Sequence, residues 1–245
     1  MIKQAKISSS KPSSCNSTLR DGLAAAWPIC FGYFPIGMAL GVLGQQAGLG
    51  PVWIGLMSVL VFAGSAQFIG VAMIDGGVSA ATIILTTFVV NFRHVLMSSA
   101  LAVPLRGTGR LFLLLFAYGV TDESFAVNMT RFRAGGWDRW RALVVHHAAN
   151  TSWILATVVG ATVGTLIPPG AFGIDFALPG MFIALLVMQL HGRAYIFTGL
   201  LAALISVIWK LLIPGDSYIV AAALLAATGG YLVRRHLRQQ REGQR

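Results

Sequence analysis

The chain has 245 residues, of which 56% are hydrophobic and only 11% are charged, and its mean hydropathy is +0.74. Soluble domains carry about 25% charged residues, so this composition indicates an integral membrane protein without room for a separate catalytic domain. The net charge of +10 lies in short flanks of apolar segments, without an aromatic-interleaved basic surface, which argues against nucleic acid as a partner.

The order of polar and apolar stretches predicts three regions. Residues 1–20 are polar and serine-rich and are expected to form a disordered cytoplasmic tail, 21–234 one transmembrane transporter domain, and 235–245 a basic cytoplasmic tail. We predict an all-α polytopic membrane protein that lies in a lipid bilayer. Apolar runs long enough to cross it occur at 22–45, 51–74, 78–104, 110–130, 141–167, 176–191, 194–213 and 217–233.

These runs give about eight transmembrane helices. If the break at residues 191–193 is a kink in one long helix, the number is seven. With eight helices and both termini in the cytoplasm, most of the 18 basic residues lie on the inner side, while Arg106 and Arg110 fall on the outer side. This asymmetry follows the positive-inside rule.

A weak internal similarity links the first and second halves of the chain. Gly37 and Gly41 recur as Gly160 and Gly164, and Gln67 recurs as Gln189. These positions could mark parallel four-helix repeats. Alternatively, small residues four apart allow two helices to pack closely.

The first two apolar runs carry candidate binding features. Pro28, Gly32, Pro35 and Gly37 predict a kink or break that exposes backbone groups to a ligand, with a simple packing kink as the alternative. In the second run, residues 62–68 read Phe-Ala-Gly-Ser-Ala-Gln-Phe. Their small residues favour close packing, and Gln67 offers an amide to a substrate or to a neighbouring helix.

The strongest pattern is a pair of charged motifs in the third and fourth runs. Asn91, Arg93 and His94 precede a turn near residue 108, and Asp122 and Glu123 follow it. Arg93 and Asp122 are each roughly fourteen residues from that turn, or about 21 Å along a helix, which places both near the middle of a bilayer.

Charges at this depth must pair or line a wet cavity, so they are candidates for substrate and ion binding. We expect Arg93 to pair with one carboxylate, which leaves the other free to exchange protons. The alternative is a structural ion pair that joins two helices.

The remaining polar residues give weaker indications. His146, His147 and Asn150 lack the further ligands that a metal site needs, and Cys15 and Cys30 support neither a disulfide framework nor a metal cluster. We therefore predict no metal. Asp175 is expected to cap a helix.

Several motifs in one order resemble the AzlC family, the larger subunit of bacterial branched-chain amino acid exporters, which includes YgaZ-like proteins. The resemblance covers about residues 20–233. It rests on the first apolar run and on residues 62–68, 91–94, 121–123 and 173–179. It implies export of branched-chain or similar small apolar amino acids across a bacterial inner membrane, together with a small AzlD-like membrane subunit.

Taken together, we predict a secondary transporter, coupled to protons, with Gln67, Asn91, Arg93, His94, Asp122 and Glu123 as its substrate- and ion-binding residues. No phosphate-binding loop is visible in the sequence, so no nucleotide or other cofactor is expected. The alternatives are an intramembrane enzyme that uses Asp122 and Glu123 with the histidines, and a non-catalytic scaffold for a partner subunit.

Overall fold

The computed structural model describes residues 15–168, 193–213 and 217–242, with single positions between 173 and 187. These residues form helices, and no strand occurs among them. The chain divides into two compact units. The first comprises residues 1–77 and 90–177, and the second comprises 78–89 and 178–245.

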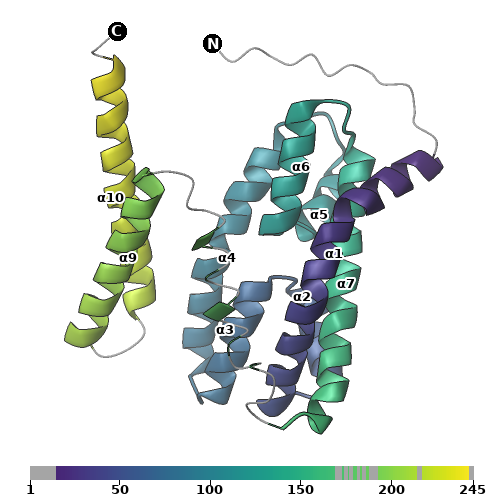
Figure 1. The fold of residues 1–245 in the computed structure, drawn as a ribbon, viewed down its shortest axis with the longest axis horizontal. Helices are drawn as coiled ribbons and strands as arrows, with labels where there is room; N and C mark the ends of the chain where they lie inside the picture. The colour runs from purple at the N-terminus through teal and green to yellow at the C-terminus, as the bar shows by residue number, and fades with distance from the viewer. Residues whose placement is uncertain are drawn as a thin grey trace. The chain divides into compact units, whose positions relative to one another are not determined.

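The first unit is built on two long helices, α1 (Cys15–Gln46) and α7 (Arg139–Val163), which lie side by side (Figure 1). A short 3-10 turn (Gly164–Leu166) extends α7. The contacts between the two helices follow the same order along each of them. Asp21 pairs with Arg141, and further along both helices Ser152 donates to the Cys30 carbonyl. The two helices are therefore parallel, and their N-termini lie at the same end of the unit.

Glycines make this close packing possible. A Cβ on Gly37 would lie 2.8 Å from the Cβ of Ala156, and a Cβ on Gly41 would collide with the α7 backbone at the Thr157 carbonyl. A Cβ on Gly160 would likewise collide with the Met38 carbonyl on α1. These glycines, which the sequence suggested could mark a repeat, thus pack directly against the opposing helix.

Gly41→Ala is expected to destabilise the protein by about 1–3 kcal/mol, because backbone atoms of α7 must move to admit the methyl group. Gly32→Ala on the same helix is the matched control, since its Cβ meets no atom within 4 Å. Thermal unfolding of the purified variants in detergent tests the difference. Equal midpoints for the two variants would show that α1 and α7 do not pack at this distance.

Contrary to one expectation, α1 does not break at its prolines. It continues as one helix through Pro28 and Pro35, although its N-terminal part leans away from the rest (Figure 1). Membrane helices tolerate proline because neighbouring groups and local adjustments satisfy the backbone that proline frees. Gly32 and Gly37 are therefore also inside a continuous helix.

Two short helices replace the single helix expected over 51–74. They are α2 (Pro51–Leu60) and α3 (Gly64–Asp75). Gln67 bonds back to Ser58 at 3.1 Å, while Ile54 and Val71 both face Gly44. These contacts make α2 and α3 an antiparallel hairpin, whose tip is residues 61–63 and whose open end faces the C-termini of α1 and α7.

The expected helix over 110–130 is also a hairpin, formed by α5 (Arg110–Tyr118) and α6 (Asp122–Ala134). Along α5, Phe112 contacts Trp140 and Phe116 contacts His146, so α5 runs parallel to α7. Along α6 the order reverses: Ser124 bonds His146, and Asn128 bonds the Ala142 carbonyl. The tip is residues 119–121, and this hairpin opens toward the N-termini of α1 and α7.

The helices of both hairpins are too short to cross a bilayer. Their helices have 9 to 13 residues, or about 14–20 Å at ~1.5 Å per residue, whereas a hydrocarbon core is about 30 Å thick. The two helices of each pair run in opposite directions, so each hairpin enters and leaves at one end of the unit. The single crossing helices predicted at 51–74 and 110–130 are thus wrong, and eight transmembrane helices are not confirmed.

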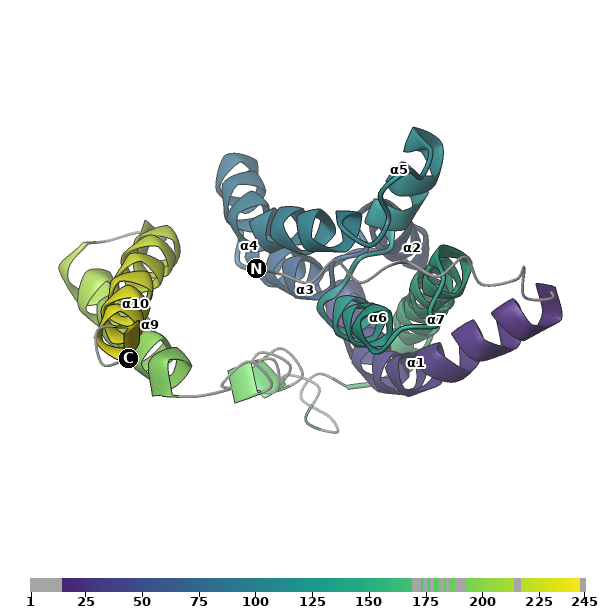
Figure 2. The same cartoon turned by 90° about the horizontal axis from the view of Figure 1, so that it is seen from above.

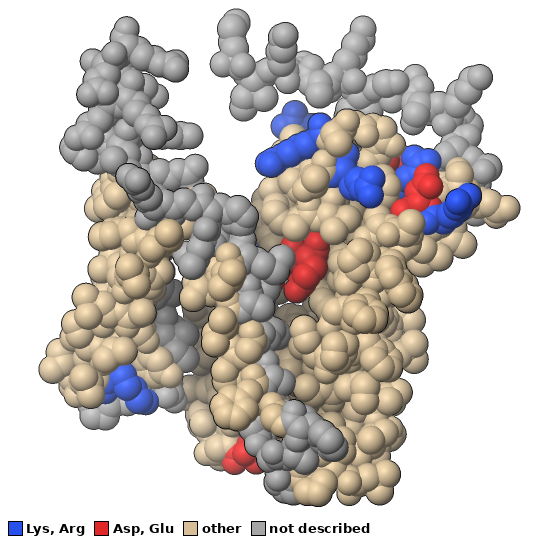
Figure 3. All heavy atoms as spheres, in the orientation of Figure 1, with Lys and Arg blue, Asp and Glu red and all other residues tan. Residues whose placement is uncertain are grey.

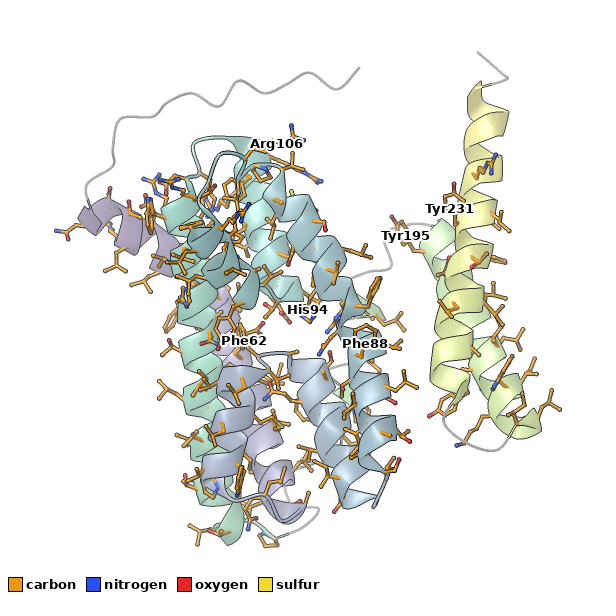
Figure 4. The ribbon with its side chains drawn as sticks, turned by 180° about the vertical axis from the view of Figure 1, so that it is seen from behind. Phe62, Phe88, His94, Arg106, Tyr195 and Tyr231 are labelled. Carbon is orange, nitrogen blue, oxygen red and sulfur yellow. The ribbon has the colours of Figure 1, made fainter. Side chains whose placement is uncertain are left out.

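Helix α4 (Ala80–Ala102) carries Arg93 and leads to the turn before α5. Its last turns pack in a cluster around Leu101, Leu105, Phe116 and Ala142. Arg106 therefore lies at the end where α7 begins, as Figure 4 shows, rather than at the opposite end as predicted. Blue side chains gather at this end of the first unit in Figure 3. The helix ends that meet here carry Arg110 at the start of α5, Arg131 and Arg133 in the last turn of α6, and Arg139 and Arg141 at the start of α7.

Arg106 and Arg110 lie at the same end as the other arginines because the α5/α6 hairpin starts and finishes at the end where α7 begins. Two arginines that seemed to oppose the positive-inside rule join the others on one side. Figure 2, seen from above, shows α6 beside α7 and α1 at this end.

The second unit contains α9 (Arg193–Leu212) and α10 (Ser217–Glu242), which pack against each other. Among the described residues, four helical segments are long and apolar enough to cross a membrane: Asn16–Gln46, Ala80–Ala102, Arg139–Leu166 and Tyr195–Leu212. Asp175, Gln189 and most of the run predicted at 176–191 lie outside the described residues.

Candidate functional site

The tips of the two hairpins meet in the middle of the first unit, and local sequence explains each break. Thr121 caps α6 through a capping box with Ser124, which fixes the helix start at Asp122. At the other tip Phe62 has a φ of 39°, a left-handed conformation that is unfavourable for a bulky side chain. Phe62 and His94 lie at mid-height of the unit in Figure 4.

Arg93 joins the two hairpins. Its Nη1 lies 3.0 Å from the Asp122 Oδ2, and its Nη2 donates to the Ser65 Oγ at 2.5 Å. Asp122 is the first residue of α6, and Ser65 lies in the first turn of α3. The predicted contact between Arg93 and a carboxylate across the turn is confirmed, and Asp122 is the partner.

Glu123 has a different environment. Its Oε2 accepts a hydrogen bond of 2.6 Å from the hydroxyl of Tyr33, which also lies 2.8 Å from the Thr121 Oγ1. Tyr33 is buried on α1 between the two prolines and packs edge-on against Trp153. The ion pairs among the described residues leave Glu123 without a basic partner.

Two buried polar side-chain atoms of α4 lack a hydrogen-bond partner among the described residues. They are the Arg93 Nε, a donor, and the Asn91 Oδ1, an acceptor. Buried polar groups usually have a hydrogen-bond partner, so both atoms are candidates for contact with a bound molecule. His94 instead contacts the Asn91 carbonyl of its own helix at 3.1 Å.

Gln67 does not face this group. Its Oε1 accepts from the Trp153 indole at 2.8 Å, and its Nε2 donates to Ser58, which in turn contacts Thr157. Only 2% of Gln67 is exposed. Both ends of the amide therefore attach the α2/α3 hairpin to α7, which is the packing role that the sequence left open.

His146 is the centre of a second buried network. The Trp137 indole can only donate, so its 3.0 Å contact identifies the Asn128 Oδ1 as the acceptor. The Asn128 Nδ2 then donates to the His146 Nε2, which leaves the His146 Nδ1 to donate to Ser124. Both imidazole nitrogens are thus used to hold the start of α6.

Sequence reasoning missed Tyr33, Ser65 and Thr121. A signal for Thr121 was present, because Thr-x-x-Ser before an apolar stretch is a capping pattern. Tyr33 and Ser65 had no local signal, since their role depends on which helices become neighbours.

The fold and the site define a membrane protein in which two half-length hairpins hold charged groups inside the apolar layer. This arrangement is typical of membrane transport proteins. The family model described as "AzlC protein" matches residues 28–167, more than half of the chain, and the chain belongs to this family.

Curated relatives agree with this assignment. The chain is 26% identical over 215 residues to the "Branched-chain amino acid transport protein AzlC" of Bacillus subtilis, covering 87% of this chain and 84% of that protein. It is 27% identical to the "Inner membrane protein YgaZ" of Escherichia coli, covering 75% and 78% of the two chains. It is also 27% identical to an "Uncharacterized membrane protein" of Archaeoglobus fulgidus, covering 86% and 93%. No solved structure gave a significant match.

Proposed function

We propose that this chain exports branched-chain or similar small apolar amino acids across a bacterial inner membrane, coupled to proton entry. The observation that carries the proposal is the group of charges at the hairpin tips, formed by Arg93, Asp122 and Glu123. The name of the Bacillus subtilis relative supports the substrate class.

The site has the chemistry to bind an amino acid zwitterion. The Arg93 Nε offers a donor to the substrate carboxylate, and the Asn91 Oδ1 offers an acceptor to its ammonium group. Asp122 neutralises Arg93 when no substrate is present. Charged groups in an apolar layer need such a partner, so substrate and Asp122 are expected to share the guanidinium in turn.

Glu123 is the proposed proton carrier. Asp122 is paired with Arg93, whereas Glu123 accepts a hydrogen bond from Tyr33 and has no ion pair among the described residues. Proton binding and release at Glu123 would then accompany each transport cycle.

The charge distribution supports one orientation. The arginine-rich end of the first unit, which also holds the N-terminus of α1, is the proposed cytoplasmic end. The basic segment near the C-terminus, from Arg234 to Arg245, supports a cytoplasmic C-terminus. A small AzlD-like membrane subunit is the proposed partner.

Counterflow in proteoliposomes tests the substrate assignment. Vesicles preloaded with unlabelled leucine are expected to accumulate labelled leucine, valine or methionine, but not labelled aspartate or lysine. The protein is reconstituted alone and with its AzlD-like partner. Counterflow of charged amino acids alone, or of none in either preparation, would contradict the proposal.

The structure does not favour the enzyme alternative. The paired histidines are not available to Asp122 and Glu123 for acid and base chemistry, because both ring nitrogens of the fully buried His146 bond Ser124 and Asn128. The names of the relatives also indicate a transport protein rather than an enzyme.

A further inference from the structure

We propose that the hydrogen bond from Tyr118 to Val59 is a latch that holds the two hairpin tips together. This bond must break before substrate can enter the site from either side of the membrane. Tyr118 is the last residue of α5, and its hydroxyl donates to the Val59 carbonyl of α2 at 2.5 Å. The inference rests on the proposed transport function. It adds the element that controls access to the site.

The acceptor of this hydrogen bond is a backbone carbonyl at the C-terminal end of α2. The last carbonyls of α2 have no partner within that helix, because the helix ends at Leu60. The Tyr118 hydroxyl therefore supplies the Val59 carbonyl with a donor inside an apolar layer, where an unsatisfied carbonyl costs much more than in water. Asn150 of α7 donates to the same hydroxyl at 3.3 Å and positions it.

The conformation of Phe62 at the α2/α3 tip depends on its contact with Tyr118. Its left-handed backbone is maintained only while surrounding contacts oppose the strain. The rings of Phe62 and Tyr118 are 6.2 Å apart at their centroids, and Phe62 is 3% exposed. Loss of the Tyr118 contact thus removes both the hydrogen bond and the packing that favour this conformation.

The position of the latch fits control of access from both sides. The α2/α3 hairpin opens toward the C-termini of α1 and α7, and the α5/α6 hairpin opens toward their N-termini. The two tips are the point at which paths from the opposite ends would meet. Tyr118 is 38% exposed, so its hydroxyl can leave Val59 without disruption of the buried core.

The test measures access to the tip directly. Ala63 at the α2/α3 tip is 4% exposed, and Ala63→Cys is introduced after Cys15→Ser and Cys30→Ser. A membrane-impermeant maleimide is applied to right-side-out and to inverted vesicles. Tyr118→Phe, which keeps the ring but removes the donor, is expected to raise the labelling rate about fivefold from both sides.

Tyr231→Phe is the matched control, since Tyr231 is an exposed tyrosine of α10. Asn150→Ala is a second variant, expected to raise labelling to a smaller extent because it only weakens the position of the hydroxyl. Thermal unfolding of each variant shows that the labelled protein is folded. Unchanged labelling in Tyr118→Phe and Asn150→Ala, or an increase from one side alone, would overturn the shared latch.

The experiments test the latch hypothesis and the substrate assignment separately. If labelling rises but no apolar amino acid shows counterflow, the latch stands and the substrate assignment fails. If leucine counterflow proceeds while labelling is the same in the parent and in Tyr118→Phe, the transport function stands and the latch fails.

Discussion

Arg93→Gln is expected to abolish transport and to destabilise the protein by about 2–3 kcal/mol, because it leaves the Asp122 carboxyl group without its partner in the apolar layer. The double variant Arg93→Gln/Asp122→Asn removes both charges. We expect it to recover most of the lost stability and none of the transport. Counterflow of labelled leucine and thermal unfolding, measured on the same preparations, separate the two effects.

Arg93→Lys refines this test. Lysine keeps the charge but cannot bond Asp122 and Ser65 through two nitrogens while presenting a third donor. We expect near-normal stability with counterflow lowered about tenfold or more. If the double neutral variant transports at the parental rate, the ion pair is only structural, and the scaffold alternative gains support.

Glu123→Gln is expected to uncouple transport from protons. Glutamine preserves an acceptor for the Tyr33 hydroxyl but cannot bind and release a proton. Valine efflux driven by a pH gradient should fall about tenfold or more, while counterflow at equal pH on both sides should change by about twofold or less. Sealed vesicles with and without a gradient provide both measurements.

Tyr33→Phe is the companion variant. It removes the hydrogen bond to Glu123 and keeps the ring that packs on Trp153, so it is expected to alter the pH dependence of efflux without loss of counterflow. Unchanged pH-driven efflux in Glu123→Gln would exclude Glu123 as the proton carrier. Asp122 or another group would then have to bind the proton.

The contact between Arg93 and a carboxylate was predictable because it depends only on the position of one turn, the rise of a helix and the cost of charge in lipid. The turn near residue 108 and the rise of a helix place Arg93 and Asp122 at one depth, and the cost of charge in lipid requires a partner. None of this needs knowledge of which helices are neighbours. Asp122 rather than Glu123 was not predictable, since adjacent residues point in different directions and the choice depends on α1 and α3.

The hairpins were not predictable from hydropathy. Residues 61–63 are as apolar as the helices that they join, so the stretch 51–74 resembles one transmembrane helix. In α1 the error was the reverse: Pro28 and Pro35 predicted a break, but the helix continues through both. A break in a membrane protein needs tertiary contacts that satisfy its free backbone groups, and the sequence does not display those contacts.

The half-length of the α2/α3 hairpin also affects how the chain is assembled during synthesis. Neither of its helices is long enough to remain in a bilayer on its own. Its anchoring partners, Trp153 and Thr157, lie on α7, which leaves the ribosome only after α4, α5 and α6. The hairpin is therefore expected to reach its final position only when α7 has inserted beside α1, so its docking is a late step in the assembly of the first unit.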